Sequence, residues 1–118
     1  MEEKEIEERL QKFIAALGNL GSLLNGVFQS GRMDIKVLER MNAAIEEMEK
    51  AERGADIEEF NVVREDCRAV YYNFNAIVSM IESQESRFMD NVTMKAVNVF
   101  LKNINASVVN IASAYGLV

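Results

Sequence analysis

The stretch from Val92 to Tyr115 constrains the fold more than any other, because its apolar residues cover more than one side of a helix. A first set recurs three and four residues apart, which places its members on a single helix face. This set comprises Met94, Val97, Leu101, Ile104, Val108, Ile111 and Tyr115. A second apolar surface lies beside it, and Lys95 and Lys102 are the only charged residues. We expect this helix to be covered on two sides, either by the rest of the chain or by another polypeptide.

Three earlier stretches show the same spacing, which is typical of the buried seams of helical bundles. The first seam comprises Ile6, Leu10, Phe13, Leu17, Leu20, Leu24 and Val27. The second comprises Ile35, Leu38, Met41, Ile45 and Met48, and the third comprises Phe60, Val63, Cys67, Val70, Phe74, Ile77 and Ile81. The pattern predicts a single all-α domain over residues 1–118. We expect an antiparallel up-down four-helix bundle, with helices at about 3–28, 34–53, 57–84 and 91–115.

Residues at the ends of these stretches indicate where the helices begin and end. Asp34 is a candidate N-cap for the second helix, and Gly54 is the residue type that follows a helix end. Asp56, with Glu59 three residues later, resembles a capping box at the start of the third helix.

Glycines within the first helix leave its course open. Gly18, Gly21 and Gly26 either permit close contact between helices or mark a weak section, and Asn25-Gly26 could end the helix early.

The connection between the third and fourth helices is also open. The seam of the third helix does not carry over into the fourth, which indicates a turn or a sharp bend at residues 83–91. No glycine or proline marks a break there. The alternative fold therefore has three helices, with a long bent last helix, and is completed by dimerisation.

Composition limits the classes of function and location. The chain has 118 residues, no proline and a net charge of -6. An acidic balance disfavours nucleic acid as a partner, because binding phosphates needs clustered lysine and arginine. The lysines and asparagines of the last stretch disfavour a membrane span. With a single cysteine and an acidic start in place of a secretory signal, the sequence favours the cytoplasm.

The residues that usually carry catalysis are scarce. The chain has no histidine, which removes the commonest general base and metal ligand. Cys67 falls on a buried seam, where a cysteine acts as a small apolar residue. Glutamate pairs at a spacing of three, such as Glu46 and Glu49, could hold a divalent cation in a carboxylate-metal enzyme, but most of them point away from the seams. We therefore expect no enzyme, no cofactor and no metal site.

A role in protein binding fits the sequence better. Methionines adapt to varied partner surfaces, although Met41 and Met48 lie on a seam and are expected to fill the core. The outer side of the fourth helix combines small, amide and apolar side chains, which suit contact with another helix. The predicted partner-binding residues are Val92, Val99, Phe100, Asn103, Ala106, Val109 and Asn110. We expect a chaperone or adaptor that sequesters an amphipathic helix of a protein partner; the alternative is a structural homo-oligomer, such as a homodimer, that pairs through the last helix.

Several features together resemble a known group of helical proteins. They are the Ser30-Gly31-Arg32-Met33-Asp34 turn, a second helix that ends in Ala51-Glu52-Arg53, a last helix that begins with Asn91-Val92-Thr93-Met94, and Tyr115-Gly116 near its end. The chain resembles the small acidic chaperones of flagellar and type III export, especially the FlgN-like group. The resemblance implies that the C-terminal helix binds an export substrate. The residues implied are Val97, Phe100, Leu101, Ile104 and Val108.

Overall fold

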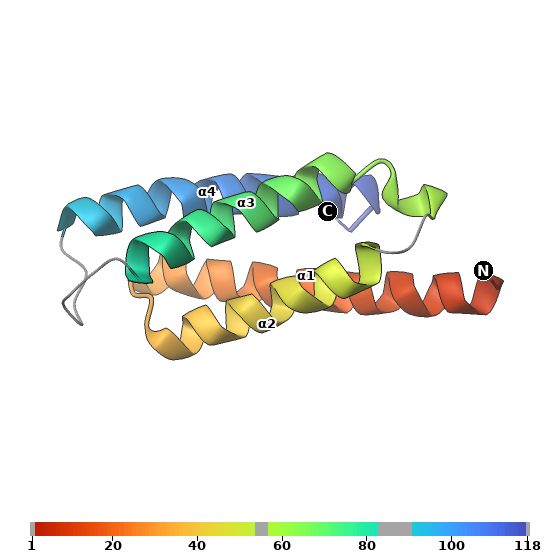
Figure 1. Ribbon diagram of the computed structural model, residues 1–118, viewed down its shortest axis with the longest axis horizontal. Helices are drawn as coiled ribbons and strands as arrows, with labels where there is room; N and C mark the ends of the chain where they lie inside the picture. Colours follow the sequence, from red (N-terminus) through yellow and green to blue (C-terminus); the bar gives the residue numbers. More distant parts are fainter. Residues whose placement is uncertain (1, 54–56, 83–90, 118) are drawn as a thin grey trace. The chain divides into compact units, whose positions relative to one another are not determined.

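The computed structural model describes residues 2–53, 57–82 and 91–117, and this part of the chain is helical with no β-strand. The described residues form four α-helices that follow one another in sequence (Figure 1). They are α1 (Glu3–Ser30), α2 (Ile35–Glu52), α3 (Arg64–Glu82) and α4 (Asn91–Ala114). A short 3₁₀ helix, η1, spans Glu58–Phe60. The predicted fold class, an all-α four-helix bundle, is confirmed in its four helices and in the packing of α1 with α2 and of α3 with α4.

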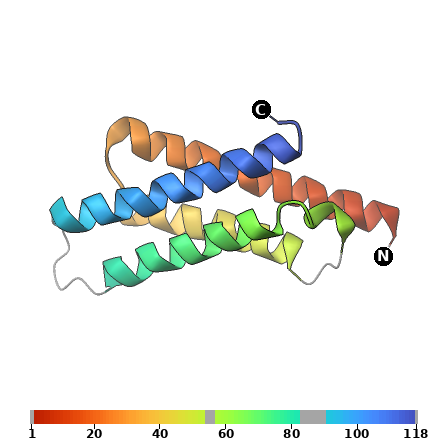
Figure 2. The same cartoon turned by 90° about the horizontal axis from the view of Figure 1, so that it is seen from above.

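The chain divides into two compact units, residues 1–64 and residues 65–118. In the first unit α1 and α2 run antiparallel, as Figures 1 and 2 show. Nη1 of Arg9, near the start of α1, donates a hydrogen bond to the carbonyl oxygen of Ala51, near the end of α2, at 3.4 Å. The prediction that the whole chain forms one domain stays a prediction.

Gly31 and Asp34 define the turn between α1 and α2. Gly31 has the left-handed conformation, with φ of 68°, and its N–H donates to the carbonyl oxygen of Val27 at 2.8 Å, which ends α1. Oδ1 of Asp34 accepts a hydrogen bond from the N–H of Val37 at 2.9 Å, which confirms Asp34 as the N-cap of α2. Because α1 continues unbroken through Gly26, the early end suggested there is wrong.

The third helix does not begin near residue 57 as one α-helix, because η1 comes first and α3 begins at Arg64. Ile57, Phe60 and Val63 are buried at a spacing of three, and a 3₁₀ helix repeats every three residues, so it keeps such side chains on one side. The Phe60 ring packs edge-to-face against Phe13 of α1, with the ring centroids 5.1 Å apart. The 3₁₀ helix η1 and the turn after it, with their apolar residues three apart, therefore take the place of the expected first turns of the α-helix.

In the second unit α3 and α4 also run antiparallel (Figure 2). Nδ2 of Asn103 donates a hydrogen bond to Oδ1 of Asn73 at 3.2 Å, and Nδ2 of Asn110 donates to Oδ1 of Asp66 at 3.3 Å. A step of seven residues forward along α4 thus corresponds to a step of seven residues back along α3. This pairing excludes the alternative in which α3 and α4 form one long bent helix.

Most residues of the predicted seams are buried. The buried members are Phe13, Leu17, Leu20, Leu24, Val27, Met41, Ile45, Met48, Phe60, Val63, Cys67, Val70, Phe74, Ile77, Val97, Leu101, Ile104, Val108 and Ile111. The assignment of Met41, Met48 and Cys67 to the core is confirmed. Ile35 is the clear error: it is the first residue of α2, directly after the turn, and its side chain is 72% exposed.

Some expectations concern residues outside the described part of the chain. Gly54 as a helix end, Asp56 as a cap and, except for Asn91, the break expected at residues 83–91 belong to this group. The described helices on either side, α2 to Glu52 and α4 from Asn91, agree with the predicted bounds to within one residue.

Candidate protein-binding face

The predicted binding residues of α4 define one face of that helix. We call this set the α4 outer face: Val92, Val99, Phe100, Asn103, Ala106, Val109 and Asn110. Val92 is 77% exposed, Val99 57% and Val109 46%. Asn103, Ala106 and Asn110 are also exposed, whereas Phe100 is half-buried. The structure thus leaves most of the predicted face exposed in this chain, whereas the sequence allowed it to be covered either by the rest of the chain or by another polypeptide.

Helix geometry explains why these side chains reach the surface. Val97, Leu101 and Ile104 are completely buried, so one side of α4 faces the core. Residues seven apart lie nearly in line along a helix, and the line of Val92 and Val99 runs on the opposite side. The valines are therefore exposed because the register of the core seam leaves no place for them inside.

The two asparagines of the face are tied to α3. Asn103 donates a hydrogen bond to Asn73, and Asn110 donates one to Asp66. Both hydrogen bonds thus join the two helices at the protein surface. Sequence reasoning missed Asn73 and Asp66. Their spacing of seven, equal to that of Asn103 and Asn110, was the available signal.

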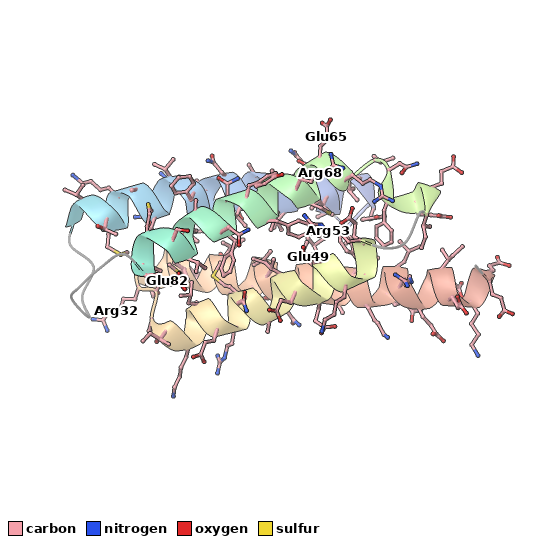
Figure 3. All side chains as sticks on the ribbon, viewed as in Figure 1. Arg32, Glu49, Arg53, Glu65, Arg68 and Glu82 are labelled. Atoms are coloured by element: carbon pink, nitrogen blue, oxygen red, sulfur yellow. The ribbon has the colours of Figure 1, made fainter. Side chains whose placement is uncertain are left out.

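Charge is distributed unusually on α4. The helix contains no carboxylate, and its charged residues are Lys95 and Lys102, both exposed. Other cations pair on the surface: Arg53 forms an ion pair with Glu49 one turn earlier on α2, as labelled in Figure 3. Among the residues that the structure describes, neither Lys95 nor Lys102 forms such a pair.

The binding residues implied by the export-chaperone resemblance mostly lie elsewhere. Val97, Leu101, Ile104 and Val108 are buried and form the core seam of α4. Only Phe100 belongs to the α4 outer face. In this structure the chain itself covers these four side chains.

The neighbouring helix adds one large exposed ring. Tyr72 of α3 is 71% exposed, whereas Tyr71 is buried. Consecutive residues on a helix point about 100° apart, so only one of the two tyrosines can face the core. Tyr72 lies on the outside of the same unit as α4.

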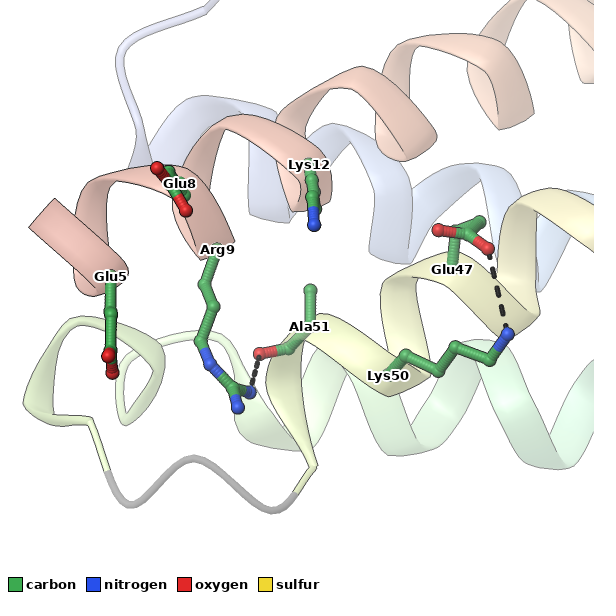
Figure 4. A pocket seen from close by; sticks show the side chains of 7 residues that line it. All are labelled: Glu5, Glu8, Arg9, Lys12, Glu47, Lys50 and Ala51. Carbon is green, nitrogen blue, oxygen red and sulfur yellow. Dashed lines mark hydrogen bonds and ion pairs between the residues drawn. The ribbon is translucent and has the colours of Figure 1, made fainter. Parts of the chain in front are cut away.

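A shallow open depression occurs in the first unit, between the start of α1 and the end of α2 (Figure 4). Its volume is about 360 Å³, and its lining residues are Glu5, Glu8, Arg9, Lys12, Glu47, Lys50 and Ala51. Positive and negative side chains alternate there, and Lys50 Nζ lies 3.8 Å from Glu47 Oε1. Within the described ranges no three acidic, cysteine or histidine residues are grouped to hold a metal ion. The depression therefore offers no site for a charged ligand of one sign.

Comparison with known proteins gives no relative: no protein-family model, curated protein or solved structure matches this chain. A search of the described helices for a segment able to cross a membrane finds none.

Proposed function

We propose that this chain is a non-enzymatic helical binding protein, a chaperone or adaptor that sequesters an amphipathic helix of a protein partner on the α4 outer face. The observation that supports this most is the exposure of Val92, Val99 and Val109 on a helix without a carboxylate. Exposed apolar side chains clustered on one element are typical of interaction surfaces.

Burial of these valines would supply the binding free energy. Fully burying one valine contributes about 1.5–3 kcal/mol, and the three are roughly half to three-quarters exposed, so together they offer about 3–5 kcal/mol. Asn103 and Asn110 would fix the orientation of the partner through their remaining hydrogen-bonding capacity. A face this small suits a transient complex, in which a client is held and released, better than a permanent one.

The resemblance to FlgN-like chaperones supports a narrower form of the proposal. The partner would then be a secretion or flagellar export substrate, held in the cytoplasm before export. This form rests on the helix pattern and the turn motifs, with the binding surface moved from the buried side of α4 to its outer face.

The test compares two matched pairs of substitutions in a tagged protein. Val99→Asp with Val109→Asp changes the α4 outer face, and Ile35→Asp with Val62→Asp changes two exposed apolar residues of the first unit. We expect the first pair to abolish capture of a partner, identified by mass spectrometry, and the control pair to leave it unchanged. Both proteins should keep the helical circular-dichroism signal.

Two outcomes would contradict the proposal. Equal capture by both variants would show that the partner binds elsewhere. Self-association of the wild type in light scattering, lost in the Val99→Asp, Val109→Asp variant, would favour the structural homo-oligomer. If that variant loses helicity, Val92→Asp replaces it, because Val92 is the most exposed of the three valines.

A further inference from the structure

The lysines of α4 restrict the chemistry of the partner. Resting on the function proposed above, we infer that the helix bound by the α4 outer face is acidic along one edge, with two carboxylates one heptad apart that pair with Lys95 and Lys102. The inference draws on the position of the two ammonium groups, on their lack of carboxylate neighbours and on the repulsion they would meet from the α4 of a second copy.

Lys95 and Lys102 lie along one edge of the face. They are seven residues apart, which corresponds to about 10.5 Å along the helix axis. The next residue on this line is Val109, and the line of Val92 and Val99 runs directly beside it. The opposite edge is the one tied to α3 through Asn103 and Asn110. A helix lying on the valines would therefore have the two ammonium groups along one flank.

The two lysines have no carboxylate neighbours on their own helix. Ion pairs within a helix join residues three or four apart, and at these distances from Lys95 and Lys102 the sequence has only valine, asparagine and alanine. Both side chains are exposed, and neither lies within 4.0 Å of a carboxylate of a described residue. Their charges are therefore available to a partner.

Charge also discriminates between the possible occupants. A second copy of the chain that docked through its own α4 would bring four ammonium groups and no carboxylate of either α4 to the interface. Like charges brought together at an interface oppose association. An acidic helix, in contrast, meets both lysines with opposite charge, so the occupant we infer is an acidic amphipathic helix of another protein.

The experiment uses three synthetic helical peptides as probes. Each has about 20 residues and the same small, apolar face, and they differ at two flanking positions seven apart, which carry glutamate, glutamine or lysine. We expect the glutamate peptide to bind the wild type most tightly in fluorescence anisotropy, about two- to thirtyfold above the glutamine peptide, as two exposed ion pairs allow. The lysine peptide should bind most weakly.

Two variants with paired charge changes show where the preference arises. Lys95→Gln with Lys102→Gln should bind the three peptides equally, whereas Lys36→Gln with Arg40→Gln, a matched loss of two exposed cations on α2, should keep the wild-type order. Raising the salt from about 50 mM to 300 mM should reduce the preference of the wild type for the glutamate peptide, because exposed ion pairs are screened. The Lys95→Gln, Lys102→Gln variant should show no such change.

The outcomes separate the two proposals. Equal binding of all three peptides by the wild type overturns the acidic partner and leaves helix binding in place. Failure of all three to bind, or binding that is unchanged by Val99→Asp with Val109→Asp, overturns the proposed function as well. A dimer in light scattering that the glutamate peptide cannot displace identifies a second copy as the occupant and also overturns the inference.

Discussion

At the scale of single residues, Gly18 and Gly26 of α1 are better explained as weak points than as contact sites. A Cβ atom added at Gly18 or Gly26 would have no other atom within 4 Å, apart from the neighbouring backbone of its own helix. Neither glycine has a positive φ. The sequence left close helix contact as one explanation, and for these two residues the structure removes it.

We predict that Gly18→Ala and Gly26→Ala each raise the free energy of unfolding by about 0.5–1 kcal/mol, because alanine loses less backbone entropy on entering a helix. Urea unfolding followed by circular dichroism measures the change. Gly31→Ala is the control: its left-handed φ of 68° strains an alanine, so it should lower the free energy by about 1 kcal/mol. A loss of stability in the first two variants would mean that the open space beside them is needed.

At the scale of the elements, an ion pair joins the end of α2 to the start of α3. Oε1 of Glu52 lies 3.0 Å from Nη1 of Arg64, and Nε of Arg64 donates a hydrogen bond to Oδ1 of Asn61 at 3.1 Å. The Glu52 side chain is 5% exposed and that of Arg64 is 26% exposed. The carboxylate is thus held in the interior, while its cation still reaches water.

This difference in burial predicts unequal costs of mutation. Arg64→Met removes the cation from a buried carboxylate and should lower the free energy of unfolding by about 3 kcal/mol. Glu52→Gln leaves a guanidinium that water can solvate and should cost about 1 kcal/mol. Urea unfolding of the two single variants and the double variant tests this; equal costs, or a double variant as destabilised as the sum, would contradict it.

The seams of the four helices could be predicted from sequence because a helix with one buried face has apolar residues every three or four positions. The same reasoning placed most of the α4 outer face, since Val92, Val99 and Ala106 follow from the core register. It failed where local geometry departs from the α-helix, as at η1, and at Ile35, the first residue of α2, whose side chain follows the core pattern in sequence but is 72% exposed. The partners of Asn103 and Asn110 depend on how α3 and α4 are aligned, which the pattern of one helix does not contain.

At the scale of the whole molecule, cooperativity decides whether the two units are one domain. A chain of about 60 residues is marginal by itself, because it buries too small a share of its surface. We therefore predict that residues 1–64 and residues 65–118 unfold together, in agreement with the single domain expected from the sequence.

The distribution of tyrosines makes this measurable without a label. All three, Tyr71, Tyr72 and Tyr115, belong to the second unit, whereas circular dichroism reports the helices of both. Coincident urea midpoints for tyrosine fluorescence and ellipticity are expected for a single transition. A lower or higher midpoint for the tyrosines would show two domains that unfold separately.

The two side-chain hydrogen bonds between α3 and α4 have a further consequence for how the chain reaches its fold. A heptad pattern matches itself after sliding by seven residues, so apolar packing alone accepts several alignments of two helices. Sliding α4 by one heptad in one direction would place Asn103 opposite Met80, and in the other direction it would place Ala96 opposite Asn73. In either direction one of the two hydrogen-bonded pairs is lost. The hydrogen bonds of Asn73 and Asp66 therefore favour the native alignment of α3 and α4 over misfolded alignments that bury the same apolar side chains.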